Sequence, residues 1–277
     1  MRTVEFPSGV RVPAIGQGTW HMGDDPSMRA EEIATIRLGL DLGATLIDTA
    51  EMYGEGAAET LIGEAVEGRR DEVFLVSKVY PHNASRRGAV AACERSLGRL
   101  RTDRLDLYLL HWRGAIPLEE TLEAFTRLRK SGKIRHFGVS NLDSEDMQEL
   151  WSAPGGRDVQ TDQVLYNLTR RGVEWDLLPW LRERRIPAMA YSPIEQGRLV
   201  RNPKLVDFAR RHGMTPGQVA LAWALRGGDV IAIPKSSHRD RLKENIAAAD
   251  IELSASELAE LDRLFPPPAG PVSLEML

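Results

Sequence analysis

The 277-residue chain has a single cysteine and no long apolar run. One cysteine, Cys93, allows no intrachain disulfide bond, and its helix-like surroundings predict a buried structural thiol. No stretch approaches the roughly 18 apolar residues that a membrane span needs. The N-terminus, Met1–Phe6, lacks the apolar segment of a secretory signal. These absences predict a cytoplasmic protein that does not associate with membranes.

The chain also lacks any concentration of positive charge. Its formal net charge is −4, and no long block of lysine and arginine occurs in the sequence. This balance argues against a surface that binds nucleic acid or another polyanion. Any anion that the protein binds should therefore be small and held by a local cluster of cations.

Several site motifs are missing as well. No two histidines have metal-ligand spacing, and there is no CxxC motif and no phosphate-binding P-loop, so no metal site is predicted. Gly54-Glu55-Gly56 begins a GxGxxG pattern, but Glu59 stands where the third glycine should be, and a Rossmann-type fingerprint fails. Five histidines are predicted to be structural or at the surface: His21, His82, His136, His212 and His238.

Strand-like and helix-like patterns alternate along the chain after a short hairpin formed by Arg2–Phe6 and Val10–Pro13. We count eight β/α units, with the first strand near Ala14–Gly18 and the last near Val230–Ile233. Such alternation predicts a parallel sheet with helical crossovers. Eight units in a chain of this length favour a closed (β/α)8 TIM barrel, forming one domain over residues 1–277. An open doubly wound sheet is the alternative.

Polar residues stand repeatedly at the ends of the apolar strand-like runs. In a (β/α)8 barrel the carboxyl ends of the strands form the active face, so these side chains should meet in one place. The residues concerned are Asp48, Lys78, His111, Ser140, Asn141, Gln163, Tyr191 and Lys235.

The first three strand ends suggest proton-coupled chemistry. A lysine that ends a buried strand needs a partner for its charge, and Asp48 is the obvious partner for Lys78. Tyr53 follows Asp48 by five residues, in the loop above the barrel. An ammonium beside a phenol favours the phenolate and pulls its pKa toward working pH. Tyr53 could then give a proton to an oxygen that His111 orients. A purely structural ion pair is the alternative.

In this order and spacing, Asp48, Tyr53, Lys78 and His111 resemble the catalytic tetrad of the aldo-keto reductase superfamily. The resemblance covers nearly the whole chain. It implies hydride transfer from a nicotinamide cofactor to an aldehyde or ketone, without a metal. Tyr53 would be the general acid, with its pKa lowered by Lys78. Asp48 would pair with Lys78, and His111 would orient the carbonyl group.

The resemblance also implies a site for the nicotinamide. Ser140, Asn141 and Gln163 look like the residues that hold its carboxamide, because amide and hydroxyl groups offer both donors and acceptors. Tyr191, followed by Ser192, looks like the ring that stacks on the nicotinamide. Packing at the barrel mouth is the structural alternative for Gln163 and Tyr191.

The last strand leads through a short polar loop to a helix N-terminus, an arrangement that favours anion binding. By resemblance, Lys235 and Arg241, with Ser236 beside them, would grip the 2′-phosphate of NADPH. Glu244 and Asn245 would contact the adenine. Two cations favour NADPH over NADH, because a bare ribose hydroxyl would leave them unpaired.

The substrate pocket is predicted with less detail. Trp20, Tyr80 and Trp112 should form its wall, and the short loop after His111 should leave it open. The tail segment Pro266–Pro271 cannot be helical and could edge the active face. The chain looks most like a bacterial branch of the superfamily that reduces methylglyoxal and other small aldehydes.

The leading interpretation is therefore an NADPH-dependent carbonyl reductase that acts as a monomer on a small carbonyl substrate. A cofactor-sensing subunit of a membrane channel would keep the same fold and cofactor residues. A lyase or isomerase that uses Lys78 as a Schiff base is a third possibility. It needs a neutral amine, which a neighbouring Asp48 opposes.

Overall fold

The computed structural model describes residues 1–277 and contains eight parallel strands in a single curled sheet. Each strand is hydrogen-bonded to its neighbours in sequence. Bridges between Ile15 and Ala232 and between Gly18 and Lys235 close the first strand onto the last. A Cβ on Gly18 would lie 2.6 Å from the carbonyl oxygen of Ile233, so only glycine permits this closure. The predicted barrel is confirmed, and the open doubly wound sheet is wrong.

The barrel strands lie close to the positions that the sequence predicts. They are β3 (Gln17–Gly18), β4 (Leu46–Asp48), β5 (Phe74–Val79), β6 (Leu105–Leu110), β7 (Ile134–Ser140), β8 (Asp162–Leu165), β9 (Ala188–Tyr191) and β10 (Val230–Ala232).

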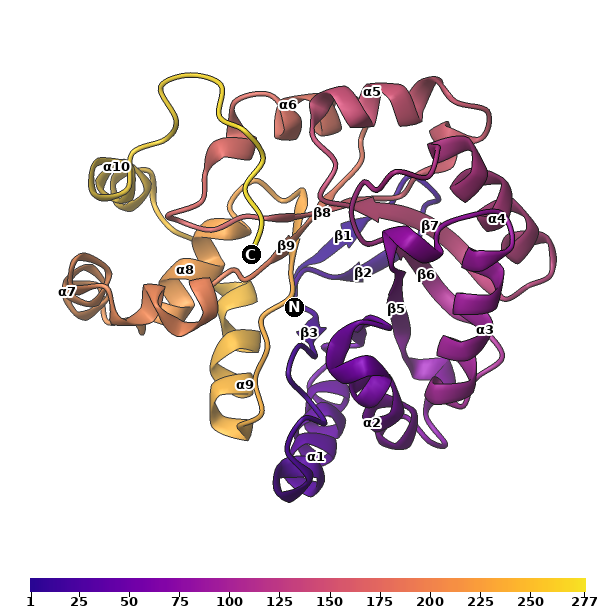
Figure 1. The fold of residues 1–277 in the computed structure, drawn as a ribbon. Helices are drawn as coiled ribbons and strands as arrows, with labels where there is room; N and C mark the ends of the chain where they lie inside the picture. Colours follow the sequence, from indigo (N-terminus) through magenta and orange to yellow (C-terminus); the bar gives the residue numbers. More distant parts are fainter.

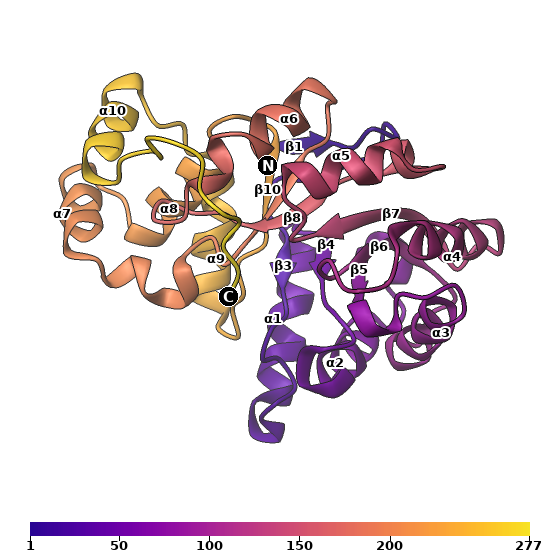
Figure 2. The same cartoon turned by 45° about the horizontal axis from the view of Figure 1, so that its top comes forward.

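Helices surround the strands on the outside of the barrel (Figures 1 and 2). Each barrel strand is followed by at least one helix, and α7 and α10 are additional. None is long and apolar enough to cross a membrane. The helices are α1 (Arg29–Asp41), α2 (Ala57–Ala65), α3 (Gly88–Leu100), α4 (Leu118–Lys130), α5 (Ser144–Ser152), α6 (Leu177–Glu183), α7 (Pro203–Arg211), α8 (Pro216–Ala224), α9 (Arg239–Ala247) and α10 (Ala255–Leu264).

The N-terminal hairpin forms a separate two-stranded antiparallel sheet of β1 (Thr3–Glu5) and β2 (Arg11–Pro13). Its apolar side chains are nevertheless part of the barrel core, because they pack in one buried cluster with side chains from inside the barrel. The ring of Phe6 stacks on Phe74 of β5 with 5.5 Å between centroids. The hairpin thus crosses the centre of the ring of strands in Figure 1, where it covers one end of the barrel.

The two-residue period of the strands carries side chains from the core to the opposite end. Leu46, Val76 and Leu109 belong to the same buried cluster as the hairpin. Because alternate residues of a strand point to the same face, the residues two positions later also point inward. Those residues are Asp48, Lys78 and His111. The packing of the apolar interior therefore places the polar side chains of Asp48, Lys78 and His111 at one mouth of the barrel.

Two buried groups lie outside this mouth. Cys93 in α3 is buried and unbonded, as predicted, and burial raises the pKa of its thiol to about 12. Asp162, at the start of β8, is fully buried, and neither carboxylate oxygen has a hydrogen-bond partner. Burial raises the pKa of Asp162 well above its usual value. The nearby backbone N–H of Leu142 partly opposes this shift, and the negative charge of Asp146 adds to it.

This raised pKa makes the stability of the fold depend on pH. The folded protein holds the Asp162 proton more tightly than the unfolded chain, whose aspartate pKa is about 3.9. The stabilising contribution is complete below that value and is lost as pH rises through the folded-state pKa. As pH rises above about 4, the wild type should lose up to about 1.4 kcal/mol of unfolding free energy per pH unit relative to Asp162→Asn, until Asp162 ionises in the folded protein.

Urea denaturation of both proteins across this pH range measures the difference. Asp240→Asn is the matched control, because the Asp240 side chain is 97% exposed. Parallel stability curves for the wild type and Asp162→Asn would show that Asp162 ionises normally in the folded protein.

Candidate active site

A buried ion pair lies at the mouth of the barrel. The ammonium of Lys78 donates to Oδ2 of Asp48 at 2.7 Å, to the backbone oxygen of Thr49 at 2.9 Å and to the hydroxyl of Tyr53 at 3.2 Å. The Lys78 side chain is completely buried, and Asp48 is 1% exposed. All three hydrogens of the ammonium therefore have an acceptor, which is what a buried lysine requires.

The surroundings of this pair fix the protonation of both Lys78 and Tyr53. Burial alone would lower the pKa of Lys78, but Asp48 and Tyr53 more than offset this, and the pKa is raised. Lys78 is therefore a cation, which argues against a Schiff-base lyase. For Tyr53, burial and the charge of Asp48 raise the pKa, whereas Lys78 lowers it.

Lys78 lowers the pKa of Tyr53, as expected, but burial and the charge of Asp48 raise it by more, so the net pKa shift is upward. The reason is that the phenol is buried together with the ammonium, and desolvation of the phenolate outweighs the attraction of one cation. Tyr53 is consequently a neutral phenol at neutral pH, with its proton available.

His111 directly follows β6 and faces Tyr53, which lies in the loop after β4. The two rings meet edge to face with 6.0 Å between their centroids. Burial, with the charge of Lys78, lowers the pKa of His111 to about 2. Its Nδ1 is buried without a hydrogen-bond partner. The imidazole is therefore neutral, and it can offer one N–H to a ligand while adding no charge.

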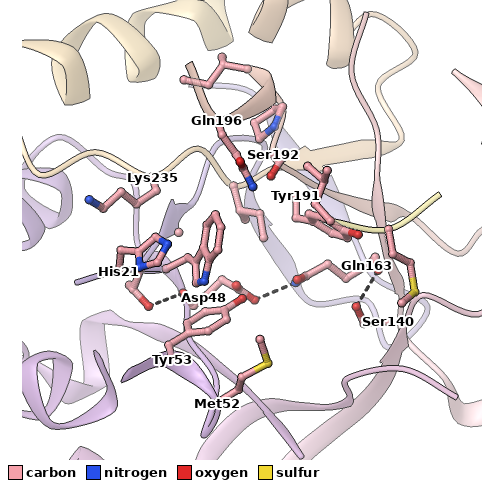
Figure 3. A pocket seen from close by; sticks show the side chains of 18 of the residues that line it. His21, Asp48, Met52, Tyr53, Ser140, Gln163, Tyr191, Ser192, Gln196 and Lys235 are labelled. Carbon is pink, nitrogen blue, oxygen red and sulfur yellow. Dashed lines mark hydrogen bonds between the residues drawn. The ribbon is translucent and has the colours of Figure 1, made fainter. Parts of the chain in front are cut away.

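The predicted nicotinamide residues form a hydrogen-bonded group beside the ion pair. Gln163 donates from Nε2 to Oδ1 of Asp48 at 2.7 Å. Asn141 donates to the backbone oxygen of His111 at 3.1 Å and accepts from the hydroxyl of Tyr191 at 3.0 Å. Figure 3 shows Gln163 reaching Asp48 through its hydrogen bond, with Tyr53 beside Asp48 and Tyr191 on the side of Gln163.

A cavity of about 500 Å³ opens above these residues. Asp48, Tyr53 and His111 line it, whereas Lys78 lies beneath them. The lining also includes Ser140, Asn141, Gln163, Tyr191 and Ser192, so the structure brings the predicted nicotinamide residues to the same cavity as three tetrad members.

A second groove of about 590 Å³ adjoins the cavity at Lys235 and Arg241. It is lined by the remaining residues predicted to bind cofactor, Ser236, Glu244 and Asn245. Figure 3 shows Lys235 projecting at the edge of the pocket, away from Gln163. The two spaces together form an elongated site with the tetrad at one end and cations at the other.

The cations of the groove have no carboxylate partners. Lys235, Arg241 and Arg201 form no ion pair, although the neighbouring Arg198 and Arg239 pair with carboxylates. Burial lowers the pKa of Lys235, and the carboxylates of Glu32 and Asp24 only partly oppose this. A bound anion would supply the missing partner. Arg201 was not predicted, because nothing in its local sequence distinguishes it from other arginines of the surface.

The predicted pocket wall is partly wrong. Trp20 and Trp112 line the cavity, but Tyr80 does not. The ring of Tyr80 lies behind, edge to face with Trp112 at 5.7 Å, and its backbone amide is held by Glu51 at 2.9 Å. The 3-10 turn that begins at Pro81 redirects the chain at this point.

Sequence reasoning also missed part of the wall. His21, predicted to be structural or at the surface, lines both spaces and lies against Trp20 with 4.1 Å between ring centroids. Met52 also lines the cavity. Its position between Asp48 and Tyr53 in the sequence could have predicted this. Met276 and Leu277 extend the wall, and the only hint was the non-helical tail before them.

Comparison with known proteins identifies the class. The chain belongs to the aldo/keto reductase family, whose sequence pattern matches residues 14–265, and it is therefore an oxidoreductase.

Individual relatives narrow the comparison. The chain is 51% identical to methylglyoxal reductase YeaE of Escherichia coli strain K12, with 100% of this chain and 99% of that protein aligned. It is 34% identical to a glyoxal reductase of Bacillus subtilis, over 95% of this chain and 92% of that protein. The crystal structure of an aldo/keto reductase from Klebsiella pneumoniae in complex with NADP and acetate superposes with a TM-score of 0.97. It is 51% identical and covers 100% of this chain and 99% of that chain.

The buried ion pair generates a stability prediction. Asp48→Asn leaves the ammonium of Lys78 buried beside a neutral amide, and we expect a loss of roughly 3–5 kcal/mol in the free energy of unfolding. The double variant Asp48→Asn/Lys78→Met removes both charges and should lose less than the sum of the two single variants. Urea denaturation of the four proteins measures this coupling. Additive losses would mean that the two charges do not support each other.

Proposed function

We propose that the protein reduces aldehydes and ketones to alcohols with NADPH, with Tyr53 as the proton donor and small reactive aldehydes such as methylglyoxal as substrates. The observation that supports this best is the phenol of Tyr53, which lines the cavity while a fully buried ammonium donates to its oxygen at 3.2 Å. A neutral phenol beside a fixed cation can donate its proton to a bound acceptor, because the cation stabilises the phenolate that remains.

The residues present fit NADPH. The cavity of about 500 Å³ and the adjoining groove of about 590 Å³ offer more room than a small substrate needs, and the groove has three cations that lack a partner. Lys235 and Arg241, with Ser236 between them in sequence, would hold the 2′-phosphate. Glu244 and Asn245 line the same groove and would face the adenine. When bound, the nicotinamide supplies a hydride to the carbonyl carbon.

The nicotinamide end is formed by the amide and hydroxyl groups beside the tetrad. Ser140, Asn141 and Gln163 would hold the carboxamide, and Tyr191 with Ser192 would support the ring. Gln163 already donates to Asp48 and Asn141 already accepts from Tyr191. Both side chains line the cavity, where a carboxamide could exchange hydrogen bonds with them. The cofactor site and the ion pair are therefore parts of one hydrogen-bonded group.

The chain's own residues complete the reduction. As the carbonyl oxygen gains an electron pair, the hydroxyl of Tyr53 transfers its proton to that oxygen and becomes a phenolate. The ammonium of Lys78 stabilises the phenolate, and Asp48 keeps the ammonium charged. A neutral N–H of His111 holds the carbonyl oxygen in place. The products are the alcohol and a tyrosinate, which regains its proton from water.

The substrate end of the cavity favours uncharged aldehydes. Its walls are the side chains of Trp20, Met52, Trp112, Met276 and Leu277, and all cations of the lining lie at the cofactor end. An acidic aldehyde would bury its carboxylate there without a partner, which is costly. The similarity to methylglyoxal reductase and glyoxal reductase supports the same class of small uncharged dicarbonyl compounds.

Tyr53→Phe tests the proton donor. Loss of the general acid should lower kcat for methylglyoxal by on the order of 10²–10⁴-fold, because no other hydroxyl group is hydrogen-bonded to the ammonium of Lys78. NADPH affinity, measured by quenching of tryptophan fluorescence, should stay close to that of the wild type. A variant as active as the wild type would contradict the assignment. If the wild type bound NADPH but reduced no aldehyde, a cofactor-sensing role would replace the proposal.

The cation cluster predicts cofactor selectivity. We expect Lys235→Met and Arg241→Met each to weaken NADPH binding about 10-fold, which corresponds to roughly 1.4 kcal/mol. The affinity for NADH should stay nearly unchanged, because NADH lacks the 2′-phosphate. Arg239→Met is the matched control, since this cation lies on the same helix but pairs with Glu31. Equal losses for both cofactors would show that the cluster does not recognise the 2′-phosphate.

A further inference from the structure

The loop after β9 is held in an unfavourable backbone conformation. Ser192, Glu195 and Gln196 have φ values of 47°, 50° and 53°, and Gly197 follows at 82°. Residues with a Cβ adopt this left-handed region only where surrounding contacts hold them. Gln196 and Gly197 line the cavity, and Figure 3 shows Ser192 and Gln196 at its edge. The strained loop is thus one wall of the proposed cofactor site.

Glu195 provides the contacts that hold this loop. Glu195 is 6% exposed and, unlike its neighbours Ile194 and Gln196, does not line the cavity. Asn167 donates to it at 2.7 Å, and Arg170 donates from Nε and Nη2 at 3.1 and 3.0 Å. Arg198 adds one more hydrogen bond at 3.0 Å. Asn167 and Arg170 both belong to the loop after β8, so Glu195 ties two neighbouring loops together.

Arg170 has a second partner from a distant part of the sequence. Its Nη1 donates to Glu275 at 2.5 Å, across 105 residues of sequence. Glu275 is followed directly by Met276 and Leu277, which line the cavity and, in the proposed function, form part of its substrate end. The yellow C-terminal tail ends beside β9 near the centre of the barrel in Figure 1. Arg170 therefore contacts both the loop at the cofactor end and the tail at the substrate end.

We propose that Arg170 is a positioning residue that fixes both walls of the cavity at once, so that retention of the cofactor and selection of substrate size are coupled through it. This inference rests on the proposed function. With one planar guanidinium, Arg170 can satisfy Glu195 and Glu275 simultaneously, because its five donors point in fixed directions. We call Glu195, Arg170 and Glu275 the Arg170 clamp.

Removal of the Arg170 clamp should have larger effects than removal of an ordinary surface ion pair. An exposed ion pair contributes little to stability. Loss of the clamp should release the strained loop toward relaxed backbone conformations and let the tail move away from the substrate. NADPH would then leave sooner, and larger aldehydes would fit better relative to small ones.

Hydrogen exchange tests the clamp in the protein without cofactor. In Arg170→Met, amide exchange in both segments 192–198 and 272–277 should accelerate about 10-fold, because both lose the same anchor. Arg198→Met is the matched control, since it removes only the exposed bond to Glu195 and should leave the tail unchanged. Exchange at wild-type rates in both segments of Arg170→Met would overturn the proposal, whatever the enzyme does with NADPH.

Two further measurements test the coupling. Stopped-flow fluorescence should show NADPH dissociating about 5-fold faster from Arg170→Met. The ratio of kcat/KM for 4-nitrobenzaldehyde to that for methylglyoxal should rise about 5-fold. Arg170→Lys, which can pair with one carboxylate but not both, should shift the two readouts only in part. Glu275→Gln should raise the selectivity ratio as much as Arg170→Met does.

The outcomes separate the clamp from the proposed function. Faster exchange with unchanged dissociation and unchanged selectivity would make Arg170 a merely structural residue and overturn the coupling. A wild type that reduces neither aldehyde would refute the proposed function. The exchange rates of the two segments would still decide whether Arg170 holds them together.

Discussion

The structure depends on one buried charge that must be neutralised. Lys78 ends a central barrel strand with no exposure to solvent, and an unpaired ammonium there would cost several kcal/mol. Asp48 supplies the counter-charge from the neighbouring strand, Thr49 supplies a backbone oxygen, and the third hydrogen reaches Tyr53. The need to satisfy the ammonium therefore places the phenol at the cavity. The hydrogen bonds of Lys78 that stabilise the barrel mouth therefore also hold the phenol of Tyr53 beside a cation.

The rest of the site is arranged around this pair by hydrogen bonds and by packing. Gln163 bonds the free oxygen of Asp48, and Asn141 connects His111 with Tyr191. Burial keeps His111 neutral and Tyr53 protonated, which are the forms that can donate hydrogen bonds or protons to a carbonyl oxygen. Cations are confined to the opposite end of the elongated space. Charge is thus separated along the site, with unpaired cations at one end and a mostly apolar wall at the other.

Local patterns in the sequence predicted the barrel and most strand ends, because the two-residue period links each buried apolar side chain to the polar one above it. They failed where placement depends on distant contacts. Tyr80 sits behind the wall because a turn at Pro81 redirects the chain, and Met276 reaches the cavity next to Glu275, which pairs with Arg170. The net pKa shift of Tyr53 sums opposing effects whose sizes depend on burial, which sequence does not reveal.

The central claim is that Tyr53 gives its proton to the carbonyl oxygen during reduction. Its most direct test is single-turnover reduction of methylglyoxal by the NADPH-loaded enzyme in H2O and in D2O. The rate should be lower in D2O, because the phenolic hydrogen exchanges with solvent and moves in the same step. Equal rates in the two solvents, at a pH where the rate does not vary, would contradict proton donation by Tyr53 in that step.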